Sequence, residues 1–239
     1  MTRAGTLRGS VAAFLGRHRW SLPLACGAAL FFARLASELA EGELGPFDAG
    51  VARAVVSLRG ELDRPMLWAT RLGEGESLLV VVVGSGALLW AAKRKREALF
   101  LVAVGSGALV LNGLLKVAFH RGRPAASELY MIHTPRSFSF PSGHALAASA
   151  VLLALVVVAR VIGVRGVYLV PLTALALTLV VGVATSRVYF GVHFPSDVLG
   201  GLLAGAGWLS VVTGWFYPRV LPGEEAAPNE PSRPGIAER

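Results

Sequence analysis

The sequence predicts an all-α, polytopic membrane protein with six transmembrane helices and one short amphipathic helix on the outer surface. Two observations support this fold class. Of the 239 residues, 54% are hydrophobic and 16% are charged, whereas about 25% of residues are charged in an average soluble domain. The apolar residues gather in six segments, and about 20 apolar residues suffice to cross a bilayer. This composition excludes a disordered chain and disfavours a soluble domain, because one small core could not bury so much apolar surface.

The six apolar segments lie near residues 20–37, 77–92, 98–115, 145–159, 166–186 and 198–217. Several are short, and flanking Lys and Arg side chains extend them by reaching toward the membrane surface. Between the first two, helical periodicity within 46–72 predicts the short amphipathic helix, with apolar positions at Phe47, Val51, Ala54, Val55 and Leu58. We therefore expect residues 1–217 to form one six-span domain and the polar, Pro-rich residues 218–239 to form a disordered tail.

Basic residues set the orientation that we predict in the membrane. Arginines precede the first segment, residues 93–96 are all basic, and Arg160 and Arg165 flank the turn between the fourth and fifth segments. These positions share one side of a six-span chain, and an excess of Lys and Arg marks the cytoplasmic side. Both termini are then cytoplasmic, and the outer face holds the loops 38–76, 116–144 and 187–197. The strong excess of arginine over lysine indicates a GC-rich bacterial genome, and hence a bacterial cytoplasmic (inner) membrane.

Small residues within the apolar segments indicate close packing between helices. Residues 83–88 and 104–109 repeat the sequence Val-Gly-Ser-Gly-Ala-Leu, and Gly201 and Gly205 lie four residues apart in the last segment. Such spacing lets helix backbones approach each other. A homodimer interface is a weaker alternative use of the same residues.

Residues that bind anions gather in the predicted outer loops. Lys116 and Arg123 are seven residues apart, so they share a helical face if the helix continues that far, and Pro124 ends it. Ser142 is a plausible N-cap for the fourth segment, and with Gly143 it forms a helix start that suits an anion. His144 follows directly and can exchange a proton near neutral pH.

A further group precedes the last segment. Asp197 follows His193 by four residues, so it can fold back and fix the tautomer of His193, which makes the other ring nitrogen a better nucleophile. Pro195 suits the first helical turn, and Arg187 offers a planar fork for phosphate oxygens. Each group alone has a structural explanation as an interfacial anchor, a capped helix or an ion cluster. Two histidines, three cations and one aspartate on one predicted membrane face instead favour phosphate chemistry.

Together these groups resemble the signature of the type 2 phosphatidic acid phosphatase family, which shares its site with vanadium haloperoxidases. The family pattern is Lys-x6-Arg-Pro, then Pro-Ser-Gly-His, then Ser-Arg-x5-His-x3-Asp, and residues 116–124, 141–144 and 186–197 match it with the right spacing. The six-span layout also resembles bacterial lipid phosphatases of this family. Ala125 departs from the pattern, since many relatives continue Arg-Pro-Arg, and Arg121 is a candidate to replace the missing substrate contact.

The resemblance implies a role for each matching residue. His193 would attack phosphorus and become a phosphohistidine, Asp197 would orient it, and His144 would protonate the leaving oxygen and then activate water. The phosphoryl oxygens would be held by Lys116, Arg123, Arg187, Ser142 and the Gly143 N–H. No metal or other cofactor is implied, and Glu128 and Asp197 are the only acids in loops 116–144 and 187–197, which argues against a two-metal phosphatase.

We therefore predict a metal-independent phosphatase in the bilayer that hydrolyses lipid phosphates or diphosphates. Undecaprenyl diphosphate, phosphatidylglycerophosphate and phosphatidate are the candidate substrates. A lipid phosphotransferase with the same site, a haloperoxidase and a non-enzymatic transporter or scaffold remain alternatives, and spans nearly free of acids disfavour the transporter. The net charge of +8 is explained by orientation signals and an anion site, so it gives no support for a nucleic-acid partner.

Overall fold

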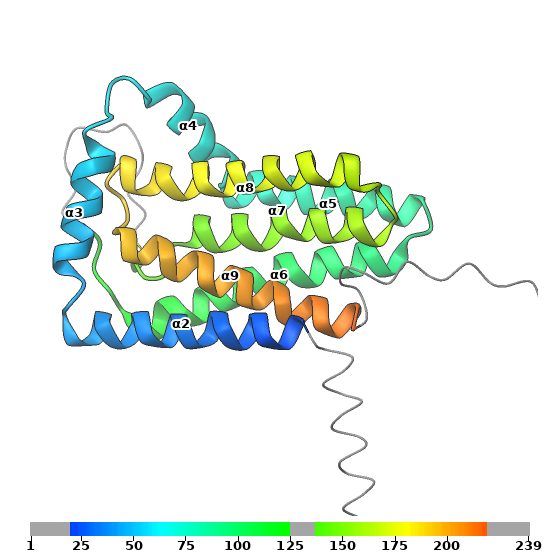
Figure 1. Cartoon of the computed structure of the whole chain (residues 1–239), viewed down its shortest axis with the longest axis horizontal. Coiled ribbons are helices and arrows are strands. Elements are labelled where there is room, and N and C mark those ends of the chain that lie inside the picture. The colour runs from blue at the N-terminus through cyan, green and yellow to red at the C-terminus, as the bar shows by residue number, and fades with distance from the viewer. Residues whose placement is uncertain (1–19, 125–136, 219–239) are drawn as a thin grey trace, which may run out of the picture.

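The computed structural model describes residues 20–124 and 137–218, and the regular elements in these ranges are all helices. The predicted disordered tail, apart from Pro218, lies outside the described residues. With the labels of Figure 1, the helices are α2 (Ser21–Glu41), α3 (Gly45–Val56), α4 (Asp63–Leu72), α5 (Gly75–Ala91), α6 (Lys95–Phe119), α7 (Gly143–Val161), α8 (Gly166–Tyr189) and α9 (Pro195–Phe216).

The long helices run side by side as one bundle (Figure 1). Helix α7 lies at its centre and packs against α5, α6, α8 and α9, while α2 packs along α9. Five helices are long and apolar enough to cross a membrane alone, namely α2, α6, α7, α8 and α9. The pair α4 and α5 passes the same test together and is bent by 53°. An all-α membrane fold with six spans is thus confirmed when the bent pair counts as one span.

The region predicted as one amphipathic helix, 46–72, contains two helices. Helix α3 lies across one end of the bundle (Figure 1) and packs against α8 and α9. A turn follows, in which Gly60 has a φ of +92°, a value that glycine adopts without a steric cost. Helix α4 then leads into α5 at Gly73, where an added Cβ would lie 2.3 Å from Val183 Cγ1. Helix α3 is therefore the cross-helix at this end of the bundle, and α4 begins the second span.

Gly201 and Gly205 bring α9 into backbone contact with α7. A Cβ on Gly201 would lie 2.5 Å from the Ser142 carbonyl oxygen, and one on Gly205 would lie 2.4 Å from the Leu146 carbonyl oxygen. These glycines therefore serve packing within the chain. The close approach also joins the N-terminal ends of both helices, where the Ser142 N–H donates to the Asp197 carbonyl at 2.9 Å.

We expect Gly205→Ala to destabilise the protein by about 1–3 kcal/mol, the usual cost of overpacking a tight contact. The new methyl group would meet the Leu146 backbone, which cannot retreat as a flexible side chain would. The matched control is Gly113→Ala in α6, where an added Cβ meets nothing within 4 Å and alanine favours the helix. Thermal midpoints of the purified proteins in detergent compare the variants, and equal midpoints would contradict the packing described here.

Candidate active site

The ends of four helices meet where α3 crosses the bundle (Figure 1). Lys116 lies in the last turn of α6, His144 in the first turn of α7, Arg187 in the last turn of α8 and Asp197 in the first turn of α9. Because these helices alternate in direction, the chain brings all four residues to one end of the bundle. The connection after α6 supplies the remaining predicted cation, Arg123, and the connection after α8 supplies the second histidine, His193.

His193 lies between a carboxylate and a guanidinium group. Its Nδ1 is 3.4 Å from Asp197 Oδ2, as the four-residue spacing predicts, and its Nε2 is 3.1 Å from Arg123 Nη1. Both His193 and Asp197 are buried. When Nδ1 donates its proton toward Asp197, the lone pair of Nε2 points toward Arg123. Nε2, the nitrogen left free to accept, therefore faces Arg123.

Burial lowers the pKa of His193 to about 4, although its hydrogen bond to Asp197 acts in the opposite direction. The positive charges of Arg123 and Arg187 lower this pKa further. At neutral pH the imidazole is therefore uncharged, as a nucleophile requires.

The Asp197 carboxylate is fixed from several sides. Its Oδ2 accepts a hydrogen bond from the Phe194 N–H at 2.9 Å and another from the Ser139 hydroxyl, while its Oδ1 accepts one from Arg121 Nη1 at 2.5 Å. Ser139 Oγ also lies 3.3 Å from His193 Nδ1. Sequence reasoning missed Ser139, because an isolated serine before the Pro-Ser-Gly-His motif carries no signal of its partner.

Arg123 and Lys116 converge on one loop, although they do not share a helical face. Helix α6 ends at Phe119, and His120 has a φ of +47°, so the condition for a shared face is not met. Arg123 instead donates from Nη1 to the Val192 carbonyl at 2.8 Å, and Lys116 donates to the carbonyl of Phe138. Burial lowers the pKa of Arg123.

Arg187 is almost completely buried, with 3% of its surface exposed. Its Nη1 donates to the Thr70 hydroxyl of α4, whereas its Nε has no hydrogen-bond partner among the residues that the structure describes. A buried guanidinium donor without a partner is costly, so Nε suits an anionic ligand. Thr70 is a second contributor that the sequence did not reveal.

Ser142 occupies the N-cap position of α7, as predicted, but its side chain makes no capping hydrogen bond. The buried Ser142 Oγ has no partner within the described ranges, and neither has the buried Oδ1 of Asn112. A Cβ on Gly143 would lie 3.0 Å from Asn112 Nδ2, so the backbone and this amide are in close contact. An unsatisfied hydroxyl beside a helix N-terminus suits a phosphoryl oxygen.

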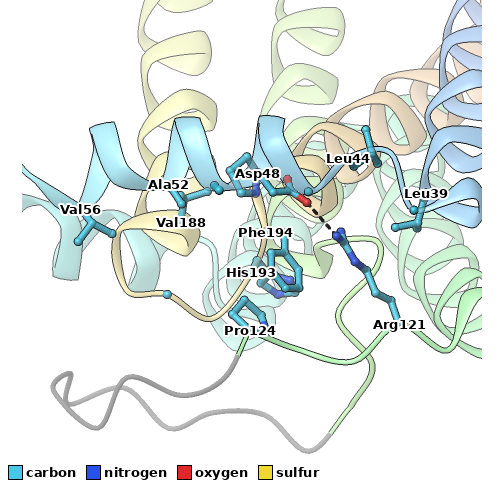
Figure 2. A pocket seen from close by; sticks show the side chains of 15 residues that line it. Leu39, Leu44, Asp48, Ala52, Val56, Arg121, Pro124, Val188, His193 and Phe194 are labelled. Carbon is cyan, nitrogen blue, oxygen red and sulfur yellow. Dashed lines mark hydrogen bonds and ion pairs between the residues drawn. The ribbon is translucent and has the colours of Figure 1, made fainter.

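Arg121, a candidate to replace the missing substrate contact, binds carboxylates instead. It bridges Asp197 and Asp48 of α3, the latter at 2.8 Å. Figure 2 shows Arg121 and Asp48 beside His193 and Phe194 in the wall of a cavity of about 570 Å³. The role expected of Arg121 is therefore not supported, and Asp48 is a buried charged residue that the sequence did not single out.

Within residues 20–124 and 137–218, no group of three or more His, Cys, Asp or Glu side chains is placed to hold a metal ion. The absence of a metal requirement stays a prediction, to be tested by chelation.

Comparison with known proteins decides the family. A family model described as the PAP2 superfamily matches residues 96–221. This region is more than half of the chain and contains every site residue predicted from the sequence. The chain belongs to the PAP2 superfamily.

This PAP2 protein is 33% identical over 180 residues to phosphatidylglycerophosphatase B of Bacillus subtilis, a match that covers 74% of this chain and 86% of the relative. It is 34% identical over 166 residues to decaprenylphosphoryl-5-phosphoribose phosphatase of Mycobacterium tuberculosis, covering 66% and 85% of the two chains. The crystal structure of a transmembrane PAP2 type phosphatidylglycerolphosphate phosphatase from Bacillus subtilis matches with a TM-score of 0.72 and 30% identity, over 80% of this chain and 94% of that chain. These matches confirm the prediction of a multi-pass membrane lipid phosphatase.

Proposed function

We propose that this PAP2 protein hydrolyses lipid phosphates through a phosphohistidine formed on His193. The placement of this side chain carries the proposal. Asp197 faces one ring nitrogen, and the other nitrogen faces Arg123 and the neighbouring cations. A phosphate attracted to those cations would meet Nε2.

In the first step, the Nε2 lone pair of His193 forms a bond to phosphorus while the bond between phosphorus and the lipid oxygen breaks. The bonding electrons leave with that oxygen, which takes a proton from the imidazolium of His144. His144 lies in the first turn of α7, and Lys116 and Arg187 lie at the same end of the bundle.

In the second step, water attacks phosphorus and the P–N bond breaks, so that the electron pair returns to Nε2. The now neutral His144 accepts the proton of the attacking water, which restores the starting state and releases inorganic phosphate. Throughout, the positive charge that develops on His193 is balanced by the carboxylate of Asp197.

The cations supply most of the stabilisation. Phosphoryl transfer depends chiefly on positioning and on neutralising the charge of the equatorial oxygens. Lys116, Arg123 and Arg187 provide the positive charge, and two donors described above, Ser142 Oγ and Arg187 Nε, lack partners in the described residues. These groups suit the three oxygens of a phosphoryl group.

The position of the site suits a lipid. Phosphate head groups lie at the membrane surface, at the depth of helix ends, while their tails remain in the hydrocarbon. The excess of basic residues at the other ends of the spans supports a site on the outer face of a bacterial cytoplasmic membrane. The relatives act on phosphatidylglycerophosphate and on a decaprenyl-linked phosphate, so phosphatidylglycerophosphate, phosphatidate and undecaprenyl diphosphate form the first substrate set.

Phosphate release from a panel of these lipids in detergent micelles tests the proposal. We expect turnover of at least one lipid, unchanged by chelation of divalent metals and lost in His193→Ala. Candidate lipid alcohols are added in a parallel arm, since transfer of phosphate to them would favour a phosphotransferase. Hydrolysis that chelation abolishes and added metal restores would contradict the mechanism.

The pKa of His193 predicts the pH dependence. Because folding lowers this pKa from the ordinary 6.5 to about 4, we expect the nucleophile to stay neutral well below pH 6.5. The value of kcat/KM for a soluble aryl phosphate, divided by the fraction of substrate dianion, should stay level through pH 6.5 and decline only toward pH 4. A decline of kcat/KM centred near pH 6.5 would contradict the assignment of His193 as the nucleophile.

The same pKa shift affects folding stability. Between pH 6.5 and pH 4, His193 binds a proton in the unfolded chain but not in the folded protein, so the free energy of unfolding falls as the pH drops from 6.5 to 4.

A further inference from the structure

We propose that Asp48 and Arg121 form a positioning relay that holds the carboxylate of Asp197 against His193. The inference rests on the proposed function of His193. It gives α3 a positioning role in the reaction. Asp48 of α3 lies outside the region 96–221 that the family model matches, so this role is not part of the matched motif region.

Arg121 connects the two carboxylates directly. Its Nη1 donates to Asp197 Oδ1 at 2.5 Å and to Ser196 Oγ at 2.8 Å. Its Nη2 donates to Asp48 Oδ2 at 2.8 Å, the contact drawn in Figure 2. The planar guanidinium group sets these donors at fixed angles, which a flexible ammonium group would not do. The guanidinium carbon also lies 4.1 Å from the centre of the Phe194 ring, so Arg121 is held from a further side.

Asp48 anchors the other end of the relay. Although α3 lies on the outside of the bundle, the Asp48 side chain is buried, with 4% of the residue exposed. Its Oδ1 accepts the Ser196 N–H at 2.8 Å and its Oδ2 accepts the Ser196 hydroxyl at 2.7 Å. Asp48 thus caps the start of α9, where a negative charge is favourable, and it fixes the residue next to Asp197.

The relay engages the Asp197 oxygen that does not face His193. Oδ2 faces His193, and Oδ1 is engaged by Arg121, so the carboxylate cannot turn toward the cations that would hold phosphate. The neighbouring cavity is lined by apolar side chains of α2, α3, α8 and the turn before α3, including Leu39, Leu44, Ala52, Val56 and Val188. Ion pairs at such a low-dielectric wall are stronger than in water.

Kinetics of the purified full-length protein in micelles test the relay. Arg121→Gln should lower kcat by about 10²-fold, the cost of a small misplacement of a reacting group. The KM for the lipid and the inhibition constant of inorganic phosphate should stay within about twofold, because the phosphate-holding side chains remain. Arg121→Lys should have a kcat between those of Arg121→Gln and the wild type, because lysine keeps the positive charge but lacks the planar, two-pronged donor group of arginine. Asp48→Asn should also lower kcat, and it should do so through Arg121. The fold-loss of kcat in the double variant Asp48→Asn/Arg121→Gln should therefore be smaller than the product of the two single fold-losses.

Arg53→Gln is the matched control, because it removes one positive charge from the exposed side of α3. It should keep the wild-type kcat, and thermal midpoints monitor folding in every variant. Wild-type kcat in Arg121→Gln would overturn the relay, as would a joint loss of kcat, phosphate inhibition and thermal stability, which indicates a purely structural role. Turnover that survives in His193→Ala would reject the proposed function and the relay together. Wild-type kcat in Arg121→Gln, combined with loss of turnover in His193→Ala, would reject the relay alone.

Discussion

Replacing His193 by alanine is expected to lower lipid phosphate hydrolysis by about 10⁴-fold or more, the scale seen when a covalent nucleophile is removed. Without Nε2, phosphate still meets Arg123 and its neighbouring cations, but no group remains to attack phosphorus. Steady-state kcat on the best lipid of the panel measures the loss. Mass spectrometry of the quenched wild-type protein should find phosphate on His193 and none in the variant.

His120→Asn is the control for losing a histidine on the same membrane face. His120 has a φ of +47°, and asparagine tolerates this left-handed conformation better than alanine does. We expect this variant to keep kcat within about threefold, because context effects of that size are usual for residues outside the reacting groups. Substantial hydrolysis in folded His193→Ala would end the assignment of His193 as nucleophile.

The second large effect is expected for His144→Ala, and it should depend on the leaving group. Lipid alkoxides are poor leaving groups that need a proton, so hydrolysis of the lipid should fall by about 10³-fold, within the range for loss of a general acid–base group. An aryl phosphate leaves without that proton, so its first step should proceed at nearly the wild-type rate. The second step still needs His144 to activate water, so phosphohistidine should accumulate.

A rapid-quench experiment with the aryl phosphate separates these steps. We expect one equivalent of phenol to appear quickly in His144→Ala, followed by slow turnover. An equal loss of the first step on both substrates would contradict the role of His144 as general acid. A fast first step without accumulated phosphoenzyme would contradict its role in activating water.

Short-range patterns in the sequence predicted the parts of the site that lie within one segment. The spacing between His193 and Asp197 predicted their contact, and Pro195 predicted the start of α9. The side chains that were missed come from distant parts of the chain. Ser196 bonds to Asp48 across 148 residues, and Arg187 bonds to Thr70 across 117 residues. A single sequence carries no periodic signal for such pairs, because they depend on how whole helices pack.

The region between the first two spans was likewise predicted only in part. Helical periodicity indicated a helix between the first two spans, yet it did not locate the turn at Gly60 or the bend at Gly73. At the bend, Gly73 fits tightly against Val183, a contact that only the packed bundle reveals. The departure from the family pattern at Ala125 made Arg121 a candidate substrate contact. In the structure, however, helix α6 ends before His120, which has a positive φ, and the Arg121 side chain donates to Asp48.

The contacts of α3 and α4 with the catalytic helices also bear on how the enzyme matures during synthesis. Asp48 and Thr70 leave the ribosome early, whereas their partners Arg121 and Arg187 follow much later. A nascent chain that has inserted only its first spans therefore presents two unpaired polar side chains and no nucleophile. A fragment that begins at α6 would contain every motif residue, yet it would lack the side chains that hold Arg121 and Arg187. We therefore expect such a fragment to be inactive, because Arg121 and Arg187 would lack the partners that hold them in the complete bundle.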